Sequence, residues 1–316
     1  MRVLQTIIGL VFVMSCDVGE IPLGPITTER EICIIPMGSS YMTQTYYNLE
    51  SNQILSQNNR VDWEIAFESK RDSNYIYLNS SKFVQAWLIS ETAFEEPINL
   101  DQALWQWDSP CLINNGTAIE DLSKKDVYYI IDLGLDENLE GSGFIKFKVI
   151  SNDVSGYTFR YSSINNSTDT TISISKNESY NKIHFSFLNN SIVNIEPPST
   201  DWDFLFSTYT HVFSENTPYL VVGVLINSQQ VSVACDSVRL FDEININNIQ
   251  GLSFNNCENI IGYNWKIFDF ESNSYTINQS KTYIVKNNNE YYKLRFLDFY
   301  NDSGEKGYPQ FEILKL

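Results

Sequence analysis

Histidine is scarce in this chain of 316 residues, which contains only His184 and His211. The sequence also has no His-Glu-x-x-His, Gly-x-Ser-x-Gly or Cys-x-x-Cys motif and no phosphate-binding glycine loop. These absences argue against the enzyme classes that depend on such motifs. Carboxylates are abundant, so composition leaves a paired-carboxylate glycosidase open, although nothing singles out such a pair. We therefore expect a protein that is not an enzyme.

Positive charge is scarce as well. The chain has 21 lysines and arginines against 39 aspartates and glutamates, which gives a formal net charge of −18. A protein that binds nucleic acid must neutralise a run of phosphates, so this balance argues against nucleic acid as a partner. The acidity is typical of a solvated, soluble surface.

Long helical blocks rich in alanine, leucine, glutamate and lysine are missing. Aromatic residues are plentiful instead, with 19 tyrosines, 19 phenylalanines and 6 tryptophans. This composition favours an all-β protein. The chain length predicts two domains, each large enough to bury its own core.

One short pattern occurs twice. Residues 61–67 read Val-Asp-Trp-Glu-Ile-Ala-Phe, and residues 200–206 read Thr-Asp-Trp-Asp-Phe-Leu-Phe. In both segments alternation predicts a strand with the tryptophan on the apolar face and the flanking acidic residues on the opposite face. Leu49 and Leu188 each lie 14 residues before the tryptophan of their segment. The chain is therefore expected to hold two copies of one β-rich unit.

The duplication predicts two tandem, related domains of β-sheet or sandwich-like form. We expect the first over residues 32–176 and the second over residues 177–316. Both carry several short alternating segments bounded by turn residues, as sandwich strands do.

The N-terminal segment has the features of an export signal. Residues 1–16 combine a positive start, an apolar run too short to span a bilayer, and a small residue directly before Cys16. This arrangement resembles the lipobox of bacterial lipoproteins, whose cysteine is lipidated and becomes the new N-terminus. We therefore predict a lipoprotein signal peptide over 1–16 and a flexible tether over 17–31. The alternative is an ordinary secretory peptide.

Several blocks resemble the HmuY family, β-rich haem-binding lipoproteins of the Bacteroidetes outer membrane. They are a Tyr/Phe-x-x-Leu opening, the repeated Asp-Trp-Asp/Glu-x-x-Phe strand, Tyr-Tyr-Lys-Leu-Arg-Phe at 291–296, and Ser-Gly-x-x-Gly-Tyr-x-x-Phe at 303–311. The blocks cover the second domain closely and the first half of the first domain. The resemblance implies a cell-surface lipoprotein that binds haem and delivers it to a TonB-dependent outer-membrane receptor.

The resemblance also implies two axial haem ligands, usually histidines, one of them shortly after the Trp-Asp strand. Glu68 and Ser207 stand five residues after the two tryptophans. His211, in the same region as Ser207, is the first candidate ligand, and His184 is the second. Because the second domain contains both histidines, it is expected to hold the haem. The first domain would then be a spacer or a receptor-docking unit, and no metal beyond the haem iron is expected.

A structural or carbohydrate-contacting surface module without haem is the alternative function, in which exposed tryptophan and tyrosine rings stack on sugars. The acidic surface favours this alternative, because it would not attract the haem propionates. A Soret band on addition of haemin would separate the two functions.

Four cysteines follow Cys16, namely Cys33, Cys111, Cys235 and Cys257. An even number in an exported chain favours disulfides, although sequence alone allows three connectivities. The duplication implies pairing within domains, Cys33 with Cys111 and Cys235 with Cys257.

Overall fold

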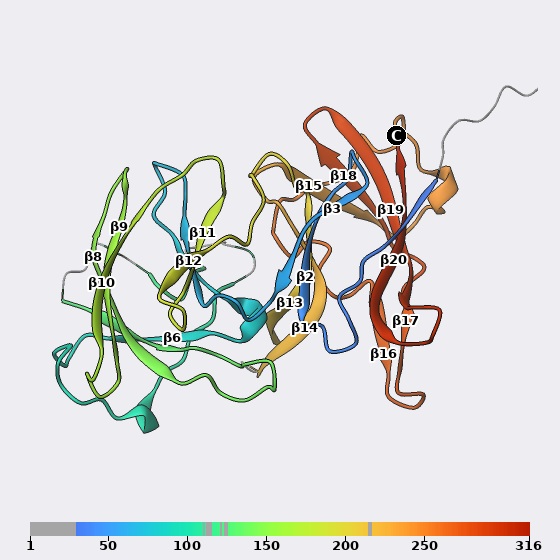
Figure 1. The fold of residues 1–316 in the computed structure, drawn as a ribbon. Helices are drawn as coiled ribbons and strands as arrows, with labels where there is room; N and C mark the ends of the chain where they lie inside the picture. The colour runs from blue at the N-terminus through green and yellow to red at the C-terminus, as the bar shows by residue number, and fades with distance from the viewer. Residues whose placement is uncertain (1–29, 110, 112–115, 121, 123–125, 214–216) are drawn as a thin grey trace, which may run out of the picture.

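The computed structural model describes residues 30–109, 111, 116–120, 122, 126–213 and 217–316 (Figure 1). These residues form β-strands and three short 3₁₀ turns, η1 (Ser80–Lys82), η2 (Leu100–Gln102) and η3 (Phe241–Glu243). The all-β prediction is confirmed. Within this part of the chain, no helix has the length and apolar character needed to cross a membrane.

The strands are β1 (Glu31–Ile34), β2 (Thr43–Asn48), β3 (Gln53–Asn59), β4 (Ile65–Glu68), β5 (Ile76–Leu78), β6 (Gln85–Ile89), β7 (Tyr128–Asp132), β8 (Phe144–Asn152), β9 (Gly156–Ser163), β10 (Asp169–Ser175), β11 (Lys182–Ser186), β12 (Ser191–Val193), β13 (Phe204–Phe213), β14 (Thr217–Ile226), β15 (Val231–Asp236), β16 (Lys266–Asp269), β17 (Ser274–Ile277), β18 (Thr282–Asn287), β19 (Glu290–Tyr300) and β20 (Lys306–Lys315).

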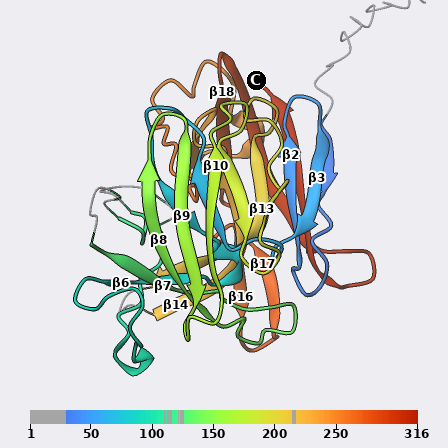
Figure 2. The same ribbon diagram turned by 60° about the vertical axis from the view of Figure 1, so that its left-hand side comes forward.

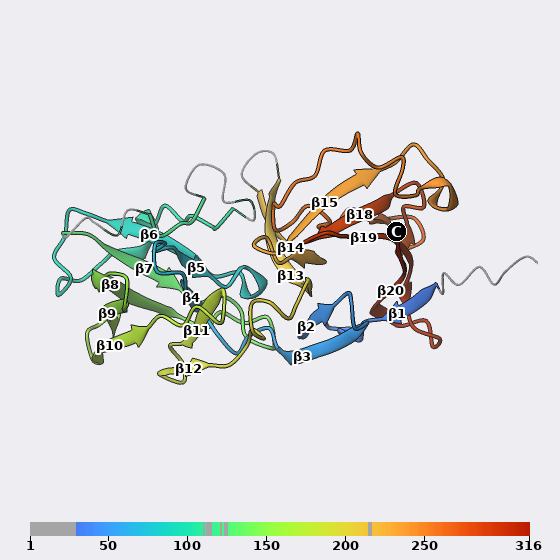
Figure 3. The same ribbon diagram turned by 90° about the horizontal axis from the view of Figure 1, so that it is seen from above.

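Two units lie side by side, each built from a five-stranded and a four-stranded antiparallel sheet (Figures 1 and 3). The first unit contains the sheets β10-β9-β8-β7-β6 and β12-β11-β4-β5. Its core is mostly aromatic and β-branched, with Phe67, Phe147, Phe159 and Phe185 all buried. Figure 2 shows β8, β9 and β10 of this unit running next to one another.

The second unit contains the sheets β1-β20-β19-β18-β15 and β14-β13-β2-β3, with the hairpin β16-β17 beside them. Its core includes Phe206, Phe296, Phe311 and Trp265, and Trp265 stacks on Phe296 with 4.0 Å between ring centroids. Each unit therefore buries an apolar core of its own.

The two units share one strand order. In the five-stranded sheets β6, β7, β8, β9 and β10 take the places of β15, β18, β19, β20 and β1. In the four-stranded sheets β4, β5, β11 and β12 take the places of β13, β14, β2 and β3. The strands that follow the two tryptophans, β4 and β13, are thus equivalent. This correspondence supports the internal duplication, which remains a proposal.

The sheets do not follow the predicted division into residues 32–176 and 177–316. Strands β1, β2 and β3 lie in the second unit, where β2 pairs with β13 (Tyr47 opposite Phe204). The hairpin β11-β12 lies in the first unit, where β11 pairs with β4 (Phe185 opposite Ile65). Each half of the chain therefore gives one hairpin to the other half. Figure 3 shows the blue strands β1–β3 joined to the orange and red unit.

Two carboxylates that we expected on the face opposite the tryptophans are buried, and each accepts a hydrogen bond from an exchanged hairpin. Glu64 and Asp203 directly follow the tryptophans and precede β4 and β13, so the strand alternation does not extend to them. Glu64 accepts hydrogen bonds from Lys82 and from the backbone N–H of Phe187, which follows β11. Asp203 accepts one from the backbone N–H of Leu49, which follows β2 (2.7 Å). Both carboxylates thus satisfy backbone donors at equivalent hairpins.

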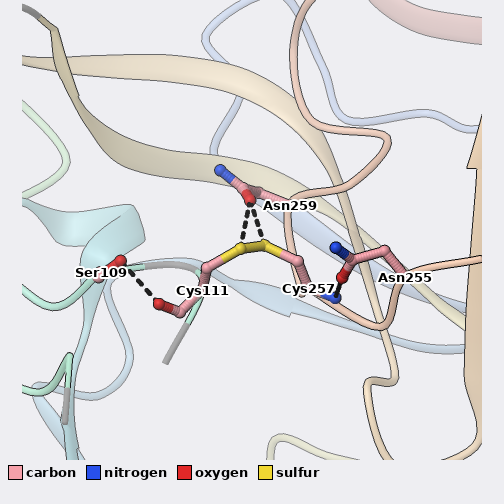
Figure 4. Close-up of a disulfide and its surroundings, with 5 residues drawn as sticks. All are labelled: Ser109, Cys111, Asn255, Cys257 and Asn259. Carbon is pink, nitrogen blue, oxygen red and sulfur yellow. Dashed lines mark hydrogen bonds between the residues drawn. A yellow bond between two sulfur atoms is a disulfide. The ribbon is translucent and has the colours of Figure 1, made fainter. Parts of the chain in front are cut away.

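The predicted disulfide pairings are wrong. Cys111 is bonded to Cys257, with 4.8 Å between the Cα atoms, while Cys33 and Cys235 are free (Figure 4). The Asn259 side-chain oxygen lies 2.9 Å from Cys257 Sγ. Pairing within domains assumed that each half folds on itself, whereas the fold brings together one loop from each unit. The disulfide therefore links the two units.

Candidate functional site

A cavity of about 580 Å³ lies between the two units. Its walls come from β4, β5 and β11 of the first unit and from β2, β13 and β14 of the second. The volume is within the range of small-molecule sites, roughly 300–1,000 Å³. The cavity is therefore not confined to the second half of the chain, where we expected the ligand.

The two tryptophans of the repeated pattern meet at this cavity. Trp63 and Trp202 both line it. Tyr46 packs edge-on against Trp202, with 5.0 Å between ring centroids. The repeat thus places one indole from each half of the chain in the same site.

His184 lines the cavity and is almost fully buried on β11. Its ring stands edge-on to Trp63, with 4.5 Å between centroids. Burial, together with a smaller effect of the nearby Lys182 charge, lowers the pKa of His184 to about 3. The imidazole is therefore neutral at physiological pH.

This neutral burial predicts a pH-dependent contribution to stability. His184 takes up a proton near pH 6.5 in the unfolded chain and only near pH 3 in the folded one, so its contribution is complete above pH 6.5 and is lost as the pH falls. Between about pH 7.5 and 4.5, the stability difference between wild type and His184→Gln should fall by roughly 2–3 kcal/mol. Urea denaturation at both pH values measures it. A pH-independent difference would contradict the account.

Carboxylates outnumber lysines around the cavity. Its charged lining residues are Glu68, Asp108, Glu196, Glu258, Lys70 and Lys182. Lys182 forms an ion pair with Glu258 (3.0 Å). Burial raises the pKa of Asp108 to about 7 and that of Glu196 to about 7. Glu196 accepts hydrogen bonds from Trp202 Nε1 (3.0 Å) and from the backbone N–H of Lys182 (3.0 Å). Partial protonation of Asp108 and Glu196 near pH 7 leaves Glu68 and Glu258 against Lys70 and Lys182, so the cavity has no surplus of positive charge to attract an anionic ligand.

His211 does not line the cavity. It lies half-buried on β13, in an aromatic cluster formed by His211, Phe213, Tyr219 and Tyr263. Its ring centroid is 4.6 Å from that of Phe213 and 5.0 Å from that of Tyr263, and Tyr219, its partner on β14, is 63% exposed. Burial lowers the pKa of His211. The structure therefore does not bring the two candidate haem ligands together in one cavity.

The two places differ in how well they fit haem. The cavity offers one histidine, His184, which is almost fully buried against Trp63, and no methionine among its described lining residues. A haem held there by both histidines does not fit. The aromatic cluster also offers one histidine, but its imidazole is only half-buried, between Phe213, which is 39% exposed, and the half-buried Tyr263. The cluster is the better match.

Sequence reasoning missed most of the polar lining of the cavity. Gln44, Asn181 and Glu196 line it, although no motif marks them. Glu68 and Ser207, the positions five residues after the tryptophans, also face it. Spacing from the tryptophans was the one usable signal, since it marks the same position, the fourth residue, in two equivalent strands.

The model of the HmuY protein family matches residues 40–313, so the chain belongs to the HmuY family. Two solved structures are similar over almost the whole chain. Apo PinO from Porphyromonas gingivitis is 9% identical and covers 92% of this chain and 98% of its own, with a TM-score of 0.30. The apo HmuY analog from Tannerella forsythia is 11% identical and covers 91% and 96%, with a TM-score of 0.26. No curated protein matches.

Proposed function

We propose that this chain is a cell-surface lipoprotein that binds haem, or a related iron-bearing ligand, at the aromatic cluster around His211. It would then pass the ligand to a TonB-dependent outer-membrane receptor. Membership of the HmuY family supports the ligand class. The placement of His211 is the observation that supports this site, because its imidazole is half-buried beside the exposed rings of Phe213 and Tyr219, where a planar ligand can reach it from solvent.

The residues of the cluster would contribute to haem binding in two ways, as an iron ligand and as contact surface for the porphyrin. Haem supplies an iron that coordinates a neutral imidazole. Burial keeps His211 neutral, which leaves a ring nitrogen free to act as a ligand. Phe213, Tyr219 and Tyr263 provide apolar and aromatic surface for the porphyrin. Tyr219 is 63% exposed, so its ring is open to a ligand that arrives from solvent.

Lipidation of Cys16 would hold the protein at the outer membrane. Cys16, the signal peptide over 1–16 and most of the tether over 17–31 lie outside the described residues, so they rest on the sequence alone. Mass spectrometry of the native N-terminal peptide should find Cys16 diacylated and at the N-terminus. Recovery of an unmodified peptide running from Met14 through Glu20 would contradict lipidation.

A haemin titration of the full chain tests the haem site. The wild type should develop a shifted Soret band, and His211→Ala should lose that shift because the axial nitrogen is gone. His184→Gln is the matched control, since it removes the other histidine at the cavity and should keep the shift. Thermal melts of the three proteins show that each is folded.

Two results would contradict this proposal. Retention of the full Soret shift by folded His211→Ala would remove His211 from the site. Absence of any Soret shift in the wild type would exclude haem as the ligand. The carbohydrate-contacting alternative would then be the function to test.

A further inference from the structure

Four buried polar atoms at the cavity have no hydrogen-bond partner. They are Gln44 Nε2, Trp63 Nε1, Asn181 Oδ1 and Ser207 Oγ. Gln44 and Ser207 are each only 1% exposed, and Asn181 is 5% exposed. Buried polar atoms without partners also occur elsewhere in the described residues, but these four belong to residues that line one cavity. Such groups are costly to bury unless something satisfies them.

The orientation of Asn181 follows from its neighbours. Asn227 Nδ2 donates to the carbonyl oxygens of Ser199 (2.8 Å) and Trp202 (3.0 Å), so its Oδ1 faces the other way. Asn181 Nδ2 donates to that oxygen (3.1 Å). The Asn181 Oδ1 atom is therefore left as an acceptor at the cavity.

Two of the donors come from the second unit. Gln44 on β2 and Ser207 on β13 are one residue beyond the paired Thr45 and Phe206, so they are neighbours across two antiparallel strands. Trp63 Nε1 adds a third donor from the first unit. The cavity thus presents donors and acceptors together, alongside the rings of two tryptophans.

We propose that this cavity is a second binding site, distinct from the aromatic cluster, and that its ligand is a neutral or amine-bearing saccharide. A sugar hydroxyl both donates and accepts, so it can satisfy Asn181 Oδ1 as well as Gln44 Nε2 and Ser207 Oγ. The apolar C–H face of a sugar ring packs on an indole, and Trp63 and Trp202 each provide one.

Other ligand classes fit less well. A carboxylate or phosphate would satisfy the donors only, and the cavity has no surplus of positive charge to attract it. A purely apolar ligand would leave all four polar atoms without partners. An amine on the sugar could instead donate hydrogen bonds to carboxylates such as Glu68 and Glu196.

A glycan microarray of neutral and amino-sugar oligosaccharides, probed with the full chain, tests this inference. The glycans that bind are then titrated while tryptophan fluorescence is recorded, because Trp63 and Trp202 line the site. Ser207→Ala should weaken binding by about tenfold, the effect of one hydrogen bond to the ligand. The same variant should melt at an unchanged or higher temperature, since it removes a buried hydroxyl that has no partner in the folded chain.

Ser69→Ala is the matched control. Ser69 is also fully buried with an unpartnered hydroxyl, but it does not line the cavity, so sugar binding should be unchanged. Failure of the wild type to bind any glycan on the array would overturn the inference. Equal sugar affinity of Ser207→Ala and wild type would also overturn it. Haemin titration of the same Ser207→Ala protein should keep its Soret shift, which separates this site from the haem site.

Discussion

A fragment that ends at residue 176 should fail to fold. It would keep β1–β10 but lose the hairpin β11-β12, which completes the four-stranded sheet of the first unit. Phe185 and Phe187 of that segment are buried in the core of the first unit, and their removal would expose its aromatic side chains and leave an edge of β4 unpaired. Circular dichroism and the dispersion of amide NMR signals measure the loss.

A second fragment provides the control. Residues 60–196 contain β4–β12, all the strands of the first unit, although this fragment is shorter than residues 31–176. It should give the dispersed amide spectrum of a folded β-protein. If residues 31–176 fold as well as residues 60–196 do, the hairpin exchange is not needed for the fold and this account of it is wrong.

Removal of the disulfide should have the second-largest effect. Cys111 and Cys257 are separated by 146 residues, so the bond closes a very long loop in the unfolded chain. In the chain-entropy model, replacement of both cysteines by serine should lower the free energy of unfolding by up to about 5 kcal/mol. Urea denaturation without reductant measures the change in midpoint.

Cys235→Ser is the matched control for that experiment. Cys235 is a free, exposed cysteine, so its replacement should change the free energy of unfolding by about 0.5 kcal/mol or less. Equal stability of this variant and the double variant would show that the link between the units contributes nothing. Thiol counting in denaturant should find two free thiols in the four cysteines after Cys16, rather than the none that pairing within domains implies.

The strands could be predicted because alternation is a local property. The segment 291–296 lies in β19, and the closing segment 303–311 leads into β20, as their apolar periodicity indicates. The hairpin exchange could not be predicted in the same way. Strands β2 and β11 are equivalent, and so are β13 and β4. The repeat therefore shows which strands are alike, but it does not show whether β2 pairs with β13 or with β4.

The burial of Glu64 and Asp203 was missed for a related reason. Alternation places each carboxylate on the face opposite its tryptophan. Each strand begins only after the carboxylate, however, and a backbone N–H of the exchanged hairpin donates a hydrogen bond to it. The disulfide prediction failed for the same cause. All three depend on contacts between the two halves of the chain.

The candidate site was predictable only in part. The repeat marked Trp63 and Trp202 as equivalent, and both line the cavity. It could not show that His184 faces this cavity while His211 belongs to a separate aromatic cluster, because that depends on which sheet each strand joins. The polar lining carries no motif, since its members come from strands far apart in the sequence.

Anomalous diffraction at the iron edge, from crystals of the full chain grown with haemin, tests the haem site most directly. We expect an iron peak beside the His211 imidazole, within the cluster formed with Phe213, Tyr219 and Tyr263. An iron peak inside the cavity beside His184, or no iron peak at either histidine, would contradict it.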